Sequence, residues 1–241
     1  MVYTLPDYTS KWRSDTPTLN INTGEIARRI SQVSSSDGRG RMRWFDDMQG
    51  VLSGWQHSTM LGGSAEVTTD RPYTGDQAHR LTTSAVATSE SRMHKTLSPG
   101  LLPRLGCEVI FCVIDNDGTF DILFSCMDDT HYSLSELRCD IKNNRIQIRD
   151  FPDVAFTTVA TQNFEDLAPT YITSKLVIDF KAGLYVRAIV NGVEIDLTGY
   201  TLKKTAGAYY YRTCINLVGR NIDAEICKYN VGAVFLTDQE P

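Results

Sequence analysis

The chain has 241 residues, of which 24 are Lys or Arg and 29 are Asp or Glu, and its formal charge is −5. Apolar residues make up 41% and charged residues 22%, which allows a packed core and excludes wholesale disorder. The mild acidity argues against a dedicated nucleic-acid binder. No apolar stretch approaches the ~20 residues of a membrane-spanning helix, and the first residues show no signal peptide.

Residues 1–40 predict an extended polar arm that contains one short helix, at about residues 23–33. Asn22 is a suitable N-cap for this helix. Ile26 and Ile30 are one turn apart and begin an apolar stripe on it. The arm is also basic, because residues before position 44 hold seven Lys or Arg against four acids, whereas the rest of the chain holds 17 against 25.

Beyond the arm the apolar pattern changes to a period of two, in short segments separated by turn residues. Segments 107–115 and 119–126 flank Asn-Asp-Gly and predict a β-hairpin. Segments 174–180 and 184–190 predict a second hairpin, and Asn191-Gly192 predicts a type I′ turn into the next strand. Roughly twelve to fifteen strands and one helix predict an all-β fold, a large antiparallel two-sheet sandwich.

The six cysteines lack the paired spacing of a zinc site, and most lie in apolar, strand-like segments. We therefore expect reduced, buried thiols, which behave as small hydrophobic side chains. They are Cys107, Cys112, Cys126, Cys139, Cys214 and Cys227.

Three passages resemble a known family when they are taken in order. Residues 43–55 read RWFDDMQGVLSGW, residues 73–81 read YTGDQAHRL, and residues 176–192 read LVIDFKAGLYVRAIVNG. Together they resemble the opening and late strands of concanavalin A-like or laminin-G-like jelly rolls. The resemblance implies one jelly-roll sandwich over residues 41–241, preceded by the arm.

A narrower similarity concerns Arg39-Gly40-Arg41 and the acidic pair ending at Asp47, which follow the polar lead. A polar lead followed by such a first segment of a jelly roll resembles accessory, decoration-type virion proteins of tailed phages. The resemblance implies a non-enzymatic structural protein of the virion, made in the host cytoplasm, that contacts copies of itself and a major capsid or other virion protein. It implies no cofactor, nucleic acid or membrane. The arm residues expected to make these contacts are Ile26, Arg28, Arg29 and Ile30.

The same fold also suggests an alternative function, a lectin-like carbohydrate-binding module or a degenerate glycoside hydrolase. Flat aromatic rings stack on the apolar faces of sugars, and the candidate rings are Trp44, Trp55, Tyr209 and Tyr211. Core packing is the competing explanation for both tryptophans, because a buried aromatic side chain removes a large apolar area from water.

Two acidic motifs were weighed as chemical sites. Glu194-Ile195-Asp196 lacks the third acid of the strand motif of related glycosidases, so we predict that the chain is not an enzyme. Asp115, Asp117 and Asp121 are spaced like the start of a calcium loop, but a hairpin turn favours the same residues for backbone reasons. The sequence therefore predicts no metal site.

Overall fold

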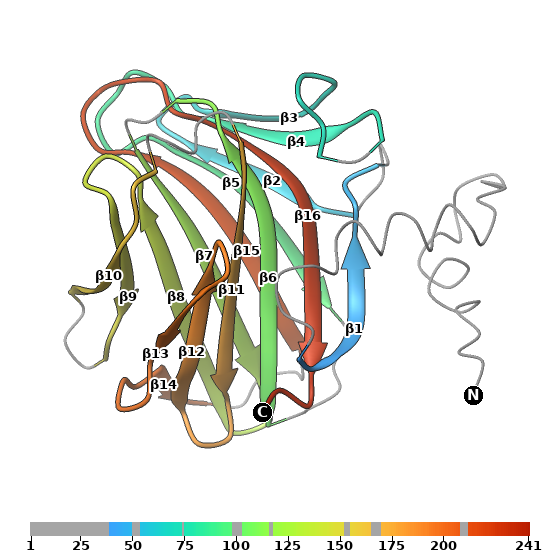
Figure 1. Ribbon diagram of the computed structural model, residues 1–241, viewed down its shortest axis with the longest axis vertical. Coiled ribbons are helices and arrows are strands. Elements are labelled where there is room, and N and C mark those ends of the chain that lie inside the picture. Colours follow the sequence, from blue (N-terminus) through green and yellow to red (C-terminus); the bar gives the residue numbers. More distant parts are fainter. Residues whose placement is uncertain are drawn as a thin grey trace, which may run out of the picture. The chain divides into compact units, whose positions relative to one another are not determined.

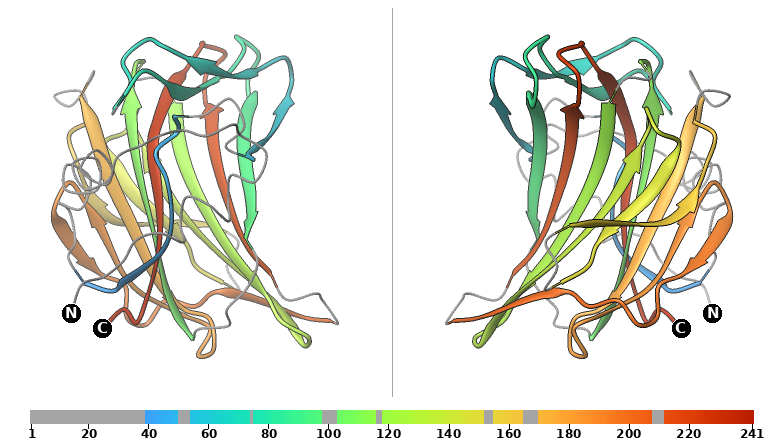
Figure 2. Two further views of the ribbon diagram at one scale, coloured as in Figure 1. Left: turned by 90° about the vertical axis from the view of Figure 1, so that its right-hand side faces the viewer. Right: turned by 90° about the vertical axis from the view of Figure 1, so that its left-hand side faces the viewer.

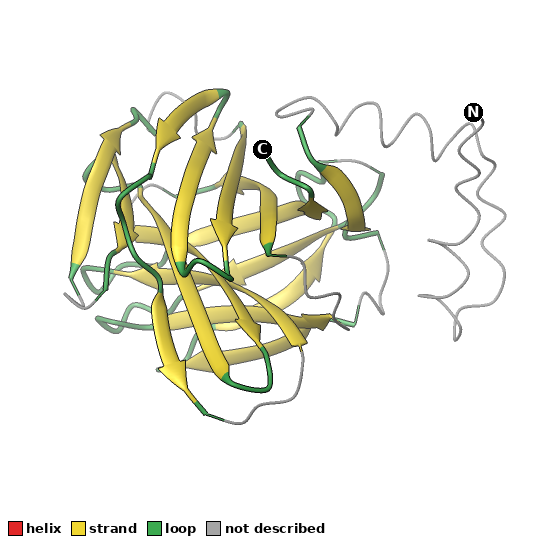
Figure 3. Ribbon diagram, turned by 90° about the horizontal axis from the view of Figure 1, so that it is seen from below, coloured by secondary structure: helices red, strands yellow, loops and turns green. Residues whose placement is uncertain are grey.

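The computed structural model describes residues 39–49, 54–73, 75–97, 103–115, 118–151, 155–164, 170–207 and 212–241. Residues 39–241 form one compact unit, distinct from residues 1–38. The predicted helix at about residues 23–33 and the four predicted arm contacts lie outside the described residues. Every regular element of the described chain is a strand (Figure 3), and none of its segments is a helix able to cross a membrane.

The described residues form sixteen strands (Figure 1), slightly more than the sequence predicts. The first eight are β1 (Arg41–Asp46), β2 (Gln56–Met60), β3 (Ser64–Thr68), β4 (Ala78–Thr82), β5 (Glu90–Leu97), β6 (Arg104–Val113), β7 (Gly118–Met127) and β8 (His131–Asp140). The others are β9 (Arg145–Arg149), β10 (Phe156–Thr161), β11 (Tyr171–Asp179), β12 (Leu184–Val190), β13 (Val193–Asp196), β14 (Lys203–Ala206), β15 (Arg212–Asn221) and β16 (Lys228–Asp238).

The strands form two antiparallel sheets that face each other across the core (Figure 2). Sheet A has the order β13-β12-β11-β6-β16-β4-β3, with β1 also paired to β16. Sheet B has the order β10-β9-β8-β7-β15-β5-β2, with β14 also paired to β8. The predicted all-β, antiparallel two-sheet sandwich is confirmed.

The register confirms one predicted hairpin and corrects another. β11 pairs with β12, and the turn from β12 to β13 has positive φ at Asn191 (49°) and Gly192 (78°), as a type I′ turn requires. By contrast, β6 belongs to sheet A and β7 to sheet B, so the hairpin predicted over residues 107–126 is wrong. The chain therefore passes from one sheet to the other between β6 and β7 instead of pairing these strands.

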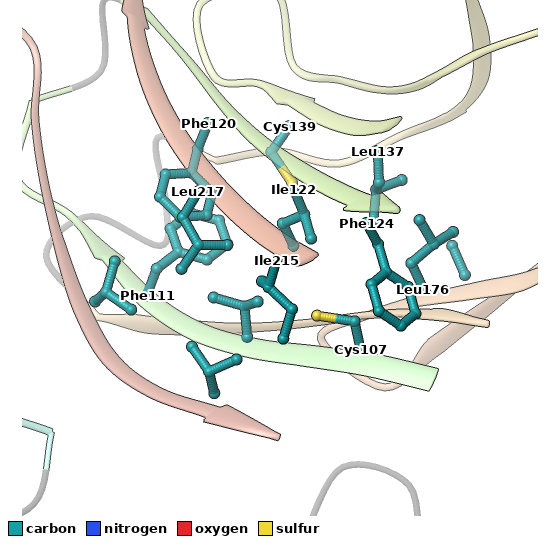
Figure 4. Packing of buried hydrophobic residues seen from close by; sticks show 14 of the residues in the cluster. Cys107, Phe111, Phe120, Ile122, Phe124, Leu137, Cys139, Leu176, Ile215 and Leu217 are labelled. Atoms are coloured by element: carbon teal, nitrogen blue, oxygen red, sulfur yellow. The ribbon is translucent and has the colours of Figure 1, made fainter. Parts of the chain in front are cut away.

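The crossing of β6 to β7 forms the centre of the core. Phe111 and Phe120 stack with their ring centroids 4.0 Å apart and their planes 14° from parallel (Figure 4). Tyr185 of β12 spans the core, where its hydroxyl accepts the Glu136 N–H (3.0 Å) and donates to the Arg149 carbonyl (2.9 Å). An aromatic stack and a hydrogen-bonded tyrosine therefore hold the two sheets in one alignment.

Five of the six cysteines are buried, and none forms a disulfide. Burial raises the pKa of Cys107, Cys126 and Cys139 above that of a free thiol. Such thiols are poor nucleophiles and act as packing groups.

We expect Phe120→Ala to destabilise the protein by about 3–5 kcal/mol, because it removes a fully buried ring and leaves a cavity between the sheets. Val86→Ala, at a side chain that is 52% exposed, is the control and should change stability by less than about 0.5 kcal/mol. Denaturant unfolding of both variants measures the difference. Equal, small effects would contradict the central role of the stack.

Candidate functional site

One face of sheet B points away from the core and carries an ordered array of polar side chains. On β7, Phe120 and Ile122 are core residues, so strand alternation directs Thr119, Asp121 and Leu123 to the outer face. Directly paired residues of antiparallel strands share a face, so the register extends this surface across the sheet.

Three rows of side chains follow from the register. The first two run from β2 to β10 across seven strands, and the third runs from β2 to β8 and is continued by the paired Arg149 and Phe156 of β9 and β10. The first row is Met60, Glu90, Arg220, Thr119, Asp140, Arg145 and Thr161. The second is Ser58, Arg92, Val218, Asp121, Arg138, Gln147 and Thr158. The third is Gln56, His94, Asn216, Leu123, Glu136, Arg149 and Phe156.

Three carboxylates and four guanidinium groups from these rows form what we name the arginine–carboxylate cluster. Asp121 lies at its centre and accepts two hydrogen bonds from Arg138, at 2.8 and 2.9 Å. The Arg220 Nε lies 2.7 Å from Oδ2 of the same carboxylate. The cluster consists of Glu90, Arg92, Asp121, Glu136, Arg138, Arg149 and Arg220.

Arg220 joins all three carboxylates of the cluster. Its terminal nitrogens lie 2.8 Å from Glu90 and 3.7 Å from Glu136, in addition to the contact with Asp121. Arg149 lies 3.1 Å from Glu136, and Arg92 lies 3.1 Å from Glu90. Acids and arginines therefore alternate, and each carboxylate has at least two guanidinium neighbours.

The charges of the cluster are arranged in depth. The side chains of Asp121 and Glu136 are fully buried and that of Glu90 is 14% exposed, whereas those of Arg138, Arg220, Arg149 and Arg92 are 17%, 26%, 28% and 37% exposed. The carboxylates therefore form a lower layer and the guanidinium groups an upper one. A molecule that approaches this face meets mainly positive charge.

Glu136 has the most unusual environment of the three acids. Burial raises its pKa and the nearby Asp121 charge adds to the effect, whereas the charges of Arg149, Arg220 and Arg138 lower it. Within the described residues neither Glu136 carboxylate oxygen accepts a hydrogen bond, so ion pairs alone compensate this group.

An aromatic ring lies at the β10 end of the cluster. The guanidinium carbon of Arg138 is 3.5 Å from the centroid of the Phe156 ring, and that of Arg149 is 4.8 Å from it. Cation–π attraction fixes the orientation of both planar groups. The two planar groups and the ring therefore form a flat cationic surface at this end of the cluster.

The tryptophans of the predicted sugar platform lie in the core instead. Trp44 is 5% exposed and Trp55 is 9% exposed, and their centroids are 6.1 Å apart. The Trp55 indole N–H donates to Asp46 (3.2 Å). Neither ring presents a face to a ligand, and Tyr209 and Tyr211 lie outside the described residues.

The three acids with calcium-like spacing, which the sequence analysis attributes to a turn, are only partly described. Asp121 is held by Arg138 and Arg220 on the outer face of sheet B, so a cation there would have to displace two guanidinium groups. Asp117 lies outside the described residues, which leaves Asp115 alone at the end of the β6 segment. Over the described ranges no three His, Cys, Asp or Glu side chains are placed to hold a metal.

The sequence analysis missed the arginine–carboxylate cluster entirely, because its members come from five strands and share no local motif. The available signal was a charged side chain between apolar neighbours, as at Asp121 in β7 and Arg138 in β8. Such a pattern marks the outer face of a strand but does not reveal which strand lies beside it.

We expect Arg220→Ala to destabilise the protein by about 3 kcal/mol, because it leaves buried carboxylates with one fewer counter-charge. Lys142→Ala removes an ion pair with Asp223 in which both side chains are at least one third exposed, and it should cost less than about 1 kcal/mol. Thermal and denaturant unfolding compare the two. If both variants lose the same small amount, the cluster contributes nothing to folding.

We expect Asp46→Asn to change the pH dependence of stability. Burial raises the pKa of Asp46 from 3.8 to about 6, despite hydrogen bonds from the Met48 and Trp55 N–H groups that lower it. A raised carboxyl pKa stabilises the folded state at low pH, and this contribution disappears as pH rises through 6. The stability of Asp46→Asn relative to the parent should therefore increase by about 2 kcal/mol between pH 4.5 and pH 8.

Comparing Asp46→Asn with the parent cancels the titrations that both proteins share. One of these is the titration of His79, because burial lowers the pKa of His79 to about 4. Asp76→Asn, at an exposed side chain, is the matched control and should show no such trend. Urea unfolding at both pH values provides the data. A constant difference between Asp46→Asn and the parent would refute the assignment.

Comparisons with known proteins identify the fold but no family. No protein-family model matches the chain, and no curated protein matches it. Among solved structures, the cellulose induced protein Cip1 has a TM-score of 0.55 at 10% identity, covering 82% of this chain and 98% of that one. An endo-β-1,4-glucuronan lyase from the fungus Trichoderma reesei has a TM-score of 0.53 at 11% identity, covering 82% and 96%.

Lectin I-B4 from Griffonia simplicifolia, in a metal-free form, has a TM-score of 0.50 at 9% identity, covering 78% and 94%. These likenesses correct one prediction, that the chain is not an enzyme. A lyase shares this fold, so a missing three-acid strand motif excludes nothing about catalysis. The protein has the concanavalin A-like jelly-roll fold.

Proposed function

We propose that this protein binds carbohydrate on the outer face of sheet B, either as a lectin-like module or as a carbohydrate-active enzyme. The observation that carries the proposal is the set of three register-aligned rows of mainly polar side chains, two of which run across seven strands. Structures named as a lectin and as a polysaccharide lyase share the fold, which supports this class of ligand.

The chemistry of the third row suits a sugar. Gln56, His94 and Asn216 follow one another on adjacent strands, and each offers a donor or acceptor to hydroxyl groups. Six strand spacings of about 4.8 Å give a face about 29 Å wide. Such a width suits an extended oligosaccharide better than a single sugar.

The structural role in a phage virion remains a prediction. The arm residues that would contact copies of the chain or a capsid protein, Ile26, Arg28, Arg29 and Ile30, lie outside the described residues. Structures named as a lectin and as a glucuronan lyase share the fold, and we therefore favour carbohydrate recognition.

We expect the double variant His94→Ala, Asn216→Ala to bind saccharides at least about tenfold more weakly than the parent, because two hydrogen-bonding side chains of the third row are lost. His131→Ala, at a partly exposed histidine that belongs to none of the three rows, is the matched control and should bind as the parent does. Calorimetric titration against a panel of neutral and acidic oligosaccharides, with unfolding curves for each variant, makes the measurement.

Chromatography of the same protein–saccharide mixtures distinguishes a carbohydrate-active enzyme from a lectin-like module. Shortened products would identify the bound saccharide as a substrate, and binding without products would identify a lectin-like module. A parent protein that binds nothing in the panel, or a double variant that binds as tightly as the parent, overturns the proposal.

A further inference from the structure

We infer that the saccharide is acidic and that its carboxylate groups are bound by the guanidinium layer of the arginine–carboxylate cluster. This inference rests on the proposed function, and it names the ligand class of the same face. It predicts an extended chain of uronate type, with charges that recur along its length, and not a neutral glycan.

The first support is the arrangement of charge in depth. Asp121 and Glu136 are fully buried, so an approaching ligand cannot contact their carboxylates without displacing arginines. Arg92 and Arg149 are the most exposed members of the cluster, at 37% and 28%. The accessible part of the cluster is therefore cationic even though its formal charge is only +1, four arginines against three acids.

The second support is the donor capacity that the upper layer retains. Within the described residues Arg92 donates one side-chain hydrogen bond, from Nη2 to Glu90 (3.1 Å), which leaves Nε and Nη1 without a protein acceptor. Arg149 contacts Glu136 through Nη1, so the Arg149 Nη2 also has no protein acceptor within the described residues. Each of these remaining N–H groups can donate a hydrogen bond to a carboxylate oxygen of a ligand.

The third support is the spacing of these two arginines. Arg92 is on β5 and Arg149 is on β9, with β15, β7 and β8 between them. Four strand spacings of about 4.8 Å place them about 19 Å apart across the sheet. Arg220 and Arg138 lie in the interval, so the cations form a track across the strands and not a single anion pocket.

The fourth support is the charge of the whole face. Among the described strand residues that alternation and register direct to it, seven are Lys or Arg and four are Asp or Glu, a net charge of +3. The whole chain carries −5, so everything outside this face sums to −8. A cationic face on an acidic protein attracts and orients an anionic chain.

The test uses one probe in two chemical forms, a hexamer of galacturonic acid and the same hexamer with its carboxyl groups reduced to alcohols. We expect the parent protein to bind the acidic form at least tenfold more tightly and to lose this preference at high salt, which screens the charges. Arg92→Gln and Arg149→Gln should each weaken binding of the acidic hexamer about tenfold more than they weaken binding of the reduced hexamer.

Arg71→Gln is the matched control, because Arg71 is an exposed arginine in the β3–β4 connection, away from sheet B, and it should bind both forms as the parent does. Arg92→Gln leaves Glu90 paired with Arg220, so it guards against a variant that fails to fold. Unfolding curves of all variants establish that any loss of binding is not a loss of structure.

The outcomes separate the two proposals. Equal binding of both hexamers overturns the acidic ligand while the proposed carbohydrate function stands, and binding of neither hexamer nor of any other saccharide in the panel overturns the proposed function itself. A sulfated neutral oligosaccharide or a single-stranded oligonucleotide that binds more tightly than the acidic hexamer would show that the guanidinium layer recognises a different anion, and it also overturns the inference.

Discussion

The stack of Phe111 on Phe120 is the contact on which the rest of the sandwich depends. These rings come from β6 and β7, strands that are consecutive in the chain but belong to opposite sheets, and their centroids are 4.0 Å apart. Once Phe120 points into the core, the two-residue period of the strand directs Asp121 to the outer face. The inner packing of β7 therefore determines where the central carboxylate of the cluster lies.

Burial of that carboxylate creates a second constraint. A charge removed from water is destabilising unless counter-charges and hydrogen bonds compensate it. Arg138 provides both for Asp121, whereas Arg220 adds a second counter-charge and extends to Glu90 and Glu136 as well. The same guanidinium groups then form the accessible layer of the face. If the proposed function holds, stability and ligand recognition are coupled, because the arginines that neutralise the buried acids are those that face solvent.

The fold limits the classes of function to consider, but it does not determine which of them this protein has. Concanavalin A-like sandwiches include proteins named as lectins and as lyases, and fold alone does not separate binding from catalysis. What separates this chain from a generic sandwich is local, namely the depth-ordered charges and the rows of polar side chains on sheet B. An argument about function has to start from those side chains and not from the missing motif of a glycosidase.

The sequence by itself determined the elements whose cause is local. Period-two patterning located the segments of β6, β7, β11 and β12, and Asn191-Gly192 specified the turn between β12 and β13, because a type I′ turn needs positive φ at both of those residues. The same local reasoning failed for the segments flanking residues 116–118. Turn residues favour a reversal of direction, but they do not indicate whether the next strand pairs with the last or crosses to the other sheet.

Only the tertiary structure decided the candidate site. Asp115, Asp117 and Asp121 are close in sequence and suggested one cation loop, yet Asp121 is bound to arginines from β8 and β15. Trp44 and Trp55 suggested a sugar platform, yet both rings fill the core. Hydrogen-bond register between strands far apart in the chain brings the seven charged residues together. Register is set by the packing of whole sheets, and no short segment of sequence contains that information.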